Sequence, residues 1–105
     1  MAQFDVYANP NAAYRDAWPW VVEVQHELLE SLPTRLSIPL GIQKPSSSTL
    51  PKRLFPSLKF KGASYTLLSP LAAPVHSGRL KKAQGSLAAY RAEIQASLDA
   101  VVAGV

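Results

Sequence analysis

A single stretch with helical periodicity, close to the C-terminal end, constrains this chain more than any other feature. From Ser86 to Val102, large apolar side chains recur every three or four residues, and alanines fill much of the remainder. The residues of this stripe are Leu87, Tyr90, Ile94, Leu98 and Val101. The pattern predicts one amphipathic helix with Ser86 as its N-cap. Because the earlier segments show no helical period, an alternating βαβ fold is not expected.

Short strand patterns separated by turn residues occupy the rest of the chain. They are residues 3–7, 20–25 and 35–42, the hairpin 58–68 and the extended, non-helical segment 69–78. In residues 3–7, Phe4 and Val6 alternate with polar positions, as in a half-buried strand. The hairpin is expected to turn at Gly62. Pro39 cannot donate a ladder hydrogen bond, so its strand is expected to be an edge strand or to break there.

Two further segments have weaker patterns. Residues 26–33 fit either the end of a strand or a short helical turn, and residues 43–52 are rich in serine, proline and lysine and predict a loop. With 105 residues and no internal repeat, the chain is expected to be one α+β domain, residues 1–105, with an antiparallel sheet.

The charges are unevenly distributed, since residues 31–92 contain no acidic residue. The basic residues of this interval are Arg35, Lys44, Lys52, Arg53, Lys59, Lys61, Arg79, Lys81, Lys82 and Arg91. These basic residues form either an ordinary solvated surface or a docking face for an anionic partner, which would be nucleic acid or an acidic protein segment.

The sequence offers little for catalysis or for metal binding. It has no cysteine, which excludes disulfides, thiolate chemistry and zinc–sulfur sites. His26 and His76 lie far apart in sequence, and no glycine-rich phosphate loop is present. We therefore expect no catalytic residues, no metal site and no cofactor. The chain also lacks a long apolar run and a signal peptide, so we expect a cytoplasmic protein without a membrane partner.

Several stretches resemble the CcdB family, the toxins of toxin–antitoxin modules. They are residues 3–7 (QFDVY), 21–40 (VVEVQHELLESLPTRLSIPL), 54–68 (LFPSLKFKGASYTLL), 71–75 (LAAPV) and the final AGV. The resemblance covers nearly the whole chain, in order and with similar spacing. It implies a small SH3-like barrel with one C-terminal helix, assembled as a two-fold homodimer.

The resemblance also implies a function. A CcdB toxin binds the A subunit of DNA gyrase and traps the enzyme on cleaved DNA, and it is an inhibitor, not an enzyme. A cognate antitoxin neutralises the toxin with an acidic disordered tail, and operator DNA is bound only by the toxin–antitoxin complex. The basic interval suits such a tail, which would fold on binding through charge attraction and burial of apolar anchors.

Site residues follow from the same resemblance. The family ends in Trp-Gly-Ile, which reaches into gyrase, and the matching residues here are Ala103, Gly104 and Val105. The residues expected to contact gyrase are Val102, Ala103, Gly104, Val105, His26, Glu27, Leu28 and Leu29. Those expected to contact the antitoxin are Tyr7, Arg35, Lys59 and Lys61. Leu28 and Leu29 would alternatively be core or dimer residues, and Val101 and Val102 would alternatively pack inside the dimer.

Three alternatives stay open at this stage. Loss of the family tryptophan implies a weaker toxin or one directed at a different groove. An inactive relative would bind only the antitoxin. A nuclease like the related MazF toxins would use Thr34 and Arg35 to cleave mRNA, with Lys59 and Lys61 on the phosphates, although the basic interval offers no acid to assist.

Overall fold

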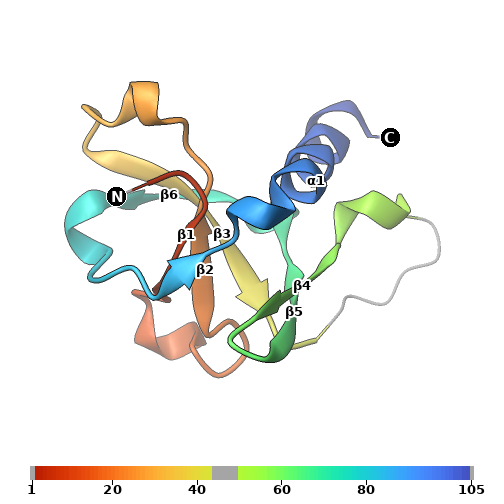
Figure 1. The fold of residues 1–105 in the computed structure, drawn as a ribbon, viewed down its shortest axis with the longest axis horizontal. Helices are drawn as coiled ribbons and strands as arrows, with labels where there is room; N and C mark the ends of the chain where they lie inside the picture. Colours follow the sequence, from red (N-terminus) through yellow and green to blue (C-terminus); the bar gives the residue numbers. More distant parts are fainter. Residues whose placement is uncertain (1, 44–49, 105) are drawn as a thin grey trace.

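The computed structural model describes residues 2–43 and 50–104. It is an antiparallel sheet followed by one helix, which confirms the predicted α+β class (Figure 1). The strands are β1 (Asp5–Ala8), β2 (Trp20–Glu23), β3 (Thr34–Gly41), β4 (Ser57–Phe60), β5 (Ala63–Leu67), β6 (Ala73–His76) and β7 (Gly85–Ser86), and the helix is α1 (Arg91–Ala103). Most of the loop expected at 43–52, with Lys44, lies outside the described residues, as does Val105.

The sheet curls into a nearly closed barrel. Its strand order is β4-β5-β3-β2-β1-β7, and β6 also pairs with β3. The two outermost strands of that order meet through one close contact, because a Cβ atom on Gly85 would lie 2.7 Å from Cε1 of Phe60. Beside this contact, the Lys59 amide of β4 donates a hydrogen bond to the Tyr90 hydroxyl (3.2 Å), which ties β4 to the segment before α1. A side chain at position 85 would therefore require the Phe60 ring to shift.

The barrel has a main core and a smaller second cluster. The main core contains Val6, Val22, Ile38, Leu40, Leu58, Leu67, Leu87 and Ile94, all with almost no exposed surface. Tyr7 is equally buried, on the opposite face of β1, where it packs with Val21 and Leu80 beneath Val75. The prediction of a half-buried strand at 3–7 was therefore wrong for Tyr7, because β6 and the segment after it cover the outer face.

The predicted hairpin is confirmed. β4 and β5 are joined by Lys61 and Gly62, whose φ angles are both positive (51° and 80°). Positive φ at both central residues is the requirement of the two-residue turn whose twist matches that of the flanking strands.

The prediction that Pro39 marks an edge or a break was wrong. β3 is continuous and has neighbours on both sides. The Val24 amide donates to the Leu36 carbonyl (2.9 Å), and in an antiparallel pair only every second residue of a strand is hydrogen-bonded to its partner strand. Counting from Leu36, Pro39 is one of the residues without such a bond, so its nitrogen faces away from β2. On that other side, β6 ends its pairing at Ser37 and β5 begins at Leu40. Proline is tolerated there because no neighbouring strand needs its missing N–H.

The predicted helix exists but begins later than Ser86. Residues 85–86 form β7 against β1, and the Leu87 amide donates to the Phe4 carbonyl (2.8 Å), so this backbone is held in the sheet. Ser86 does not cap α1. Its Oγ instead accepts a hydrogen bond from the Ala88 amide (3.1 Å) at the start of the 3-10 turn η6 (Ala88–Tyr90), and α1 follows from Arg91.

Helix α1 packs against η3 (Lys52–Leu54) and η4 (Ser69–Leu71) through a narrow face. Its buried residues are Ile94, Ser97 and Ala100. The Ser97 hydroxyl lies 2.7 Å from the Leu54 carbonyl oxygen and 2.6 Å from the Ser69 hydroxyl, so both 3-10 turns are hydrogen-bonded to the helix. The apolar stripe expected from the sequence is confirmed for Leu87, Tyr90, Ile94 and Leu98, which lie in or pack against the main core. It was wrong for Val101, which is exposed.

Short 3-10 turns account for two other segments. Residues 26–33, which the sequence left ambiguous, contain η2 (Glu27–Leu29). The extended segment expected at 69–78 is confirmed for β6 but wrong at its ends, where η4 and η5 (Ser77–Arg79) form. In the part of the chain that the structure describes, no helix is long and apolar enough to cross a membrane.

Candidate functional site

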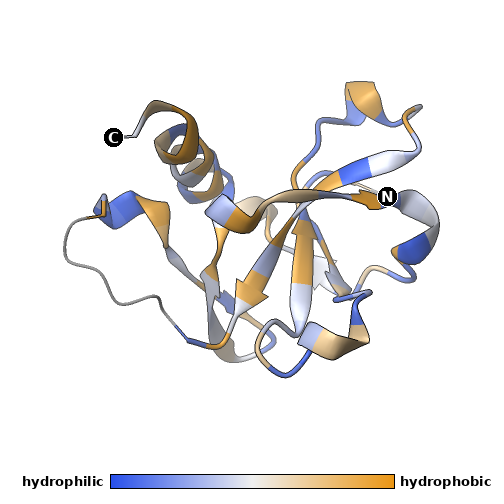
Figure 2. Cartoon of the chain, turned by 180° about the vertical axis from the view of Figure 1, so that it is seen from behind, coloured by the Kyte–Doolittle hydropathy of each residue, from blue (hydrophilic) through white to orange (hydrophobic). Residues whose placement is uncertain are grey.

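The C-terminal end of α1 is an exposed apolar projection. Val101 is 44% exposed and Val102 89%, and Ala103 is also exposed. Gly104 ends the helix in the left-handed conformation (φ 77°), with its amide donating to the Ala100 carbonyl (2.8 Å). Figure 1 shows this end extending away from the sheet, and Figure 2 shows hydrophobic residues on it as well as on the central strands. The described residues of the expected gyrase contact are thus outside the core.

The second expected target region is a separate exposed loop. His26 begins it, and its Nδ1 accepts a hydrogen bond from the Leu28 amide (3.1 Å). Leu28 is 86% exposed and Leu29 48%, and Glu27 is exposed as well. A core role for the two leucines was therefore wrong. In Figure 1 this loop and the end of α1 project toward the same side of the molecule at separate places, so one chain does not bring them together.

The loop continues into further exposed leucines that were not among the expected site residues. Leu32 follows η2 and Leu36 lies in β3, and both are exposed. With Leu28 and Leu29 they form what we call the leucine strip, four large apolar side chains within nine positions of the chain. The signal in the sequence was a leucine-rich segment, but its periodicity did not say which way the leucines face.

Two side chains hold the loop in place. The Gln25 amide nitrogen donates to the carbonyls of Leu29 (3.0 Å) and Thr34 (3.1 Å), and its Oε1 accepts from the Leu36 amide (3.0 Å). On the inner side, the Arg35 guanidinium donates to the carbonyls of Leu32 (2.7 Å) and Glu30 (2.8 Å). Gln25 and Arg35 are positioning residues for the leucine strip, a role that the sequence pattern did not indicate for either.

The expected antitoxin residues divide into two groups. Lys59 and Lys61 are exposed on the β4–β5 hairpin, and the Lys61 ammonium lies 5.8 Å from the centre of the Phe60 ring. Tyr7 is only 1% exposed and Arg35 is also buried, so neither presents a surface to a partner in this conformation. The structure brings these two together with Glu23 inside the molecule and leaves the lysines outside.

Nearly the whole chain matches one protein family. The model of the CcdB protein family matches residues 3–104. The chain belongs to the CcdB family. This membership agrees with the nearly closed barrel and the C-terminal helix, and it supports a toxin of a toxin–antitoxin module. A comparison with curated proteins found no match.

In this CcdB chain, Glu23 and Arg35 form a buried ion pair. Arg35 Nε lies 3.6 Å from Glu23 Oε2, and both side chains are almost fully enclosed. Burial raises the pKa of Glu23, although the Arg35 charge opposes the rise. Burial also raises the pKa of Tyr7 to about 12, with the Glu23 carboxylate adding to the effect. Tyr7 therefore keeps its proton at neutral pH.

The Glu23 shift predicts how stability depends on pH. The folded state holds the Glu23 proton to higher pH than the unfolded chain, so it binds more protons across that interval. The contribution of Glu23 to the free energy of unfolding therefore falls as pH rises from the ordinary carboxyl pKa to the raised one. Glu23→Gln cannot ionise, so its stability relative to the natural chain is expected to improve across the same interval.

Urea denaturation of both proteins between about pH 4 and pH 8 measures this difference. Glu93→Gln, which removes an exposed carboxyl from α1, is the matched control. A difference between the natural chain and Glu23→Gln that stayed constant with pH would contradict the prediction.

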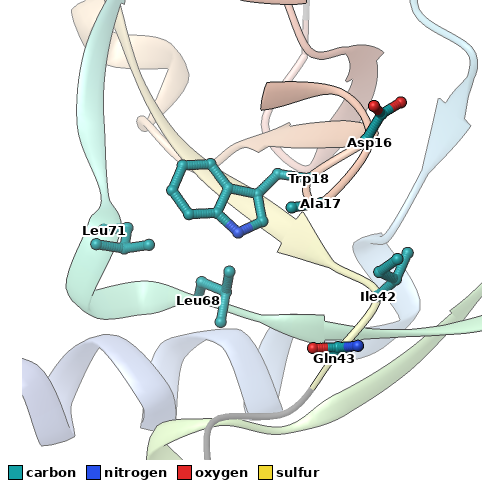
Figure 3. A pocket seen from close by; sticks show the side chains of 7 residues that line it. All are labelled: Asp16, Ala17, Trp18, Ile42, Gln43, Leu68 and Leu71. Atoms are coloured by element: carbon teal, nitrogen blue, oxygen red, sulfur yellow. The ribbon is translucent and has the colours of Figure 1, made fainter. Parts of the chain in front are cut away.

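One surface hollow has a volume of about 540 Å³ and mainly apolar walls (Figure 3). It is lined by Asp16, Ala17, Trp18, Ile42, Gln43, Leu68 and Leu71. Asp16 is its one ionisable lining residue, so the hollow lacks the acid–base pair that hydrolysis needs. Within residues 2–43 and 50–104, no three His, Cys, Asp or Glu side chains are grouped to hold a metal ion. The hollow suits an apolar side chain of a partner better than a reaction.

Proposed function

We propose that this chain is a toxin that binds the A subunit of DNA gyrase, traps the enzyme on cleaved DNA and is neutralised by an antitoxin with an acidic tail. The observation that carries the proposal is the exposed apolar end of α1. A helix end with Val101, Val102 and Ala103 in water costs solvation free energy, which insertion into a partner would recover. The helix is fixed to the barrel by Ser97, so the end is presented in a defined direction.

The leucine strip supports a two-fold homodimer as the active form. Exposed apolar side chains that are grouped along one segment are typical of protein interfaces. A two-fold dimer would present two α1 ends and two copies of the loop to the target, and gyrase A is itself a dimer in the family's mechanism. The contact made by the α1 end and the contact made by the loop would then each contribute to the binding free energy twice.

The nuclease alternative receives no support from the geometry. Its proposed cation, Arg35, is buried, with its guanidinium already donating to backbone carbonyls and paired with Glu23. An RNA phosphate could not reach it without opening the loop. We therefore propose no catalytic role for Thr34 or Arg35.

Incubation of the chain with gyrase, ATP and supercoiled plasmid tests the proposal. Trapped double-strand breaks that rise with toxin concentration are the expected result. A variant that lacks residues 104 and 105 should lose this activity while it elutes at the same volume in gel filtration. Intact plasmid at saturating toxin would refute gyrase as the target, and RNA degradation in a parallel tube would favour the nuclease.

The two hairpin lysines are proposed to attract the antitoxin tail. Lys59→Glu together with Lys61→Glu is expected to slow association by about tenfold or more at low salt and to change dissociation much less, because charges at an interface rim act mainly on the encounter. Stopped-flow association with the antitoxin's acidic segment measures both rates. Lys81→Glu with Lys82→Glu changes the net charge equally at another place and is the control. Equal slowing by both pairs would show that only net charge matters and would contradict a specific role for the hairpin.

A further inference from the structure

A second hollow, of about 290 Å³, is lined by four cations from two distant segments. Arg15 follows η1 (Ala12–Tyr14), whereas Arg79, Lys81 and Lys82 lie between β6 and β7. All four side chains are exposed. The two segments are held side by side by the hydrogen bonds from the Gln84 amide to the Val6 carbonyl (2.7 Å) and from Arg79 to the Pro10 carbonyl (3.2 Å). We call this group the cation pocket.

Each of the two arginines is hydrogen-bonded to a backbone carbonyl without any ligand. Arg15 Nε donates to the Asn9 carbonyl (2.6 Å), and Arg79 Nη2 donates to the carbonyl of Pro10, the next residue. Both arginines line the same hollow, and each keeps most of its five N–H donors free. No acidic residue lines the hollow. In the described residues the ion pair is Glu23–Arg35, so neither arginine has a carboxylate partner.

Four cations around one hollow, with no acidic residue in the lining, favour a bound anion. Like charges held close together repel, and the repulsion is relieved only by salt or by a bound group of opposite charge. Arginine forks match the oxygens of a phosphate or a carboxylate in a bidentate manner. The chemistry of the hollow therefore selects an anionic ligand with several acceptor oxygens.

The lining decides between the anionic ligands. An acidic peptide that orders on binding needs apolar anchors, but the apolar residues here are only Ala8, Pro10 and Gly78. A nucleotide or a single strand would need an aromatic surface on which a base could stack, and no aromatic side chain lines the hollow. The phosphodiester backbone of duplex DNA needs neither, because its contacts are cations and N–H donors.

We propose that the cation pocket binds the phosphate backbone of duplex DNA directly, without sequence preference. This contact goes beyond the proposed action on gyrase, and it is distinct from recognition of operator DNA, which the family resemblance assigns to the toxin–antitoxin complex. It means that the toxin itself adds to the affinity of any assembly in which it meets DNA, at a surface separate from the end of α1.

Fluorescence anisotropy of the full chain with a labelled 24-base-pair duplex tests the contact at 50 to 200 mM salt. Salt-dependent binding is expected, and Lys81→Ala with Lys82→Ala should weaken it about tenfold at low salt and reduce the slope of log K against log salt by about 2. The control is Lys52→Ala with Arg53→Ala, which removes the same charge from η3. Thermal unfolding of each variant verifies the fold.

Three results would overturn the proposal. They are absence of binding at 50 mM salt, equal losses in the two double variants, and tighter binding of a glutamate-rich peptide of equal charge to the same lysines. The measurement contains neither gyrase nor antitoxin. Absence of DNA binding would therefore leave the proposed gyrase target unaffected, and trapping of gyrase would not support DNA binding by the cation pocket.

Discussion

Replacing Ala103 with tryptophan is expected to strengthen binding of this chain to the gyrase A subunit by about 30- to 1,000-fold. The CcdB family, which this chain resembles along its length, ends in Trp-Gly-Ile, and truncating a tryptophan anchor to alanine typically costs about 2–4 kcal/mol of binding. Ala103 is the last residue of α1 and is exposed, so the larger side chain meets solvent and not the core. The fold is therefore expected to tolerate it.

Titration of gyrase A with the two proteins measures the gain, and the plasmid cleavage assay should show the same order of potency. Ala92→Trp is the matched control, since it adds the same side chain to an exposed alanine at the other end of α1. An equal gain from both variants would indicate a nonspecific effect of tryptophan. If Ala103→Trp alone failed to tighten binding, the terminus of this chain would have to enter a differently shaped groove.

Local patterns predicted the parts of this fold whose structure is decided locally. The hairpin follows from Gly62 between two alternating strands, and α1 follows from its period. The start of α1 could not be predicted, because Ser86 resembles an N-cap in sequence whereas the backbone at Gly85 and Ser86 is taken up by pairing with β1. Pairing between residues some eighty positions apart leaves no periodic trace in either segment.

The candidate site residues came from the family resemblance. It named the end of α1 and the leucines of the loop, which are exposed as a target contact requires. It also named Arg35 and Tyr7 as antitoxin contacts, and these are buried. Charge alone does not distinguish a cation at a surface from one that donates to carbonyls inside a loop. Gln25 was missed for the same reason, because its role depends on three backbone groups that only the fold brings near it.

The inner and outer faces of α1 separate stability from function, and a pair of substitutions is expected to show it. Ile94 is fully buried in the main core, so Ile94→Ala should lower the free energy of unfolding by about 2–5 kcal/mol through lost burial and a cavity. Val102, on the outer face, contacts almost nothing, so Val102→Asp should change stability by about 0.5 kcal/mol or less. A charge at that position would, however, have to be desolvated in gyrase.

Urea denaturation and the plasmid cleavage assay distinguish the two faces. Below its unfolding transition, Ile94→Ala should still trap gyrase, whereas Val102→Asp should be fully folded and inactive. A destabilised Val102→Asp would mean that the end of α1 is held by contacts such as the dimer's own interior, and the apolar end would then be structural. Folded, active Val102→Asp would instead move the target contact away from α1. Only a stable, inactive variant fits a helix whose inner face anchors it to the barrel and whose outer end is left for a partner.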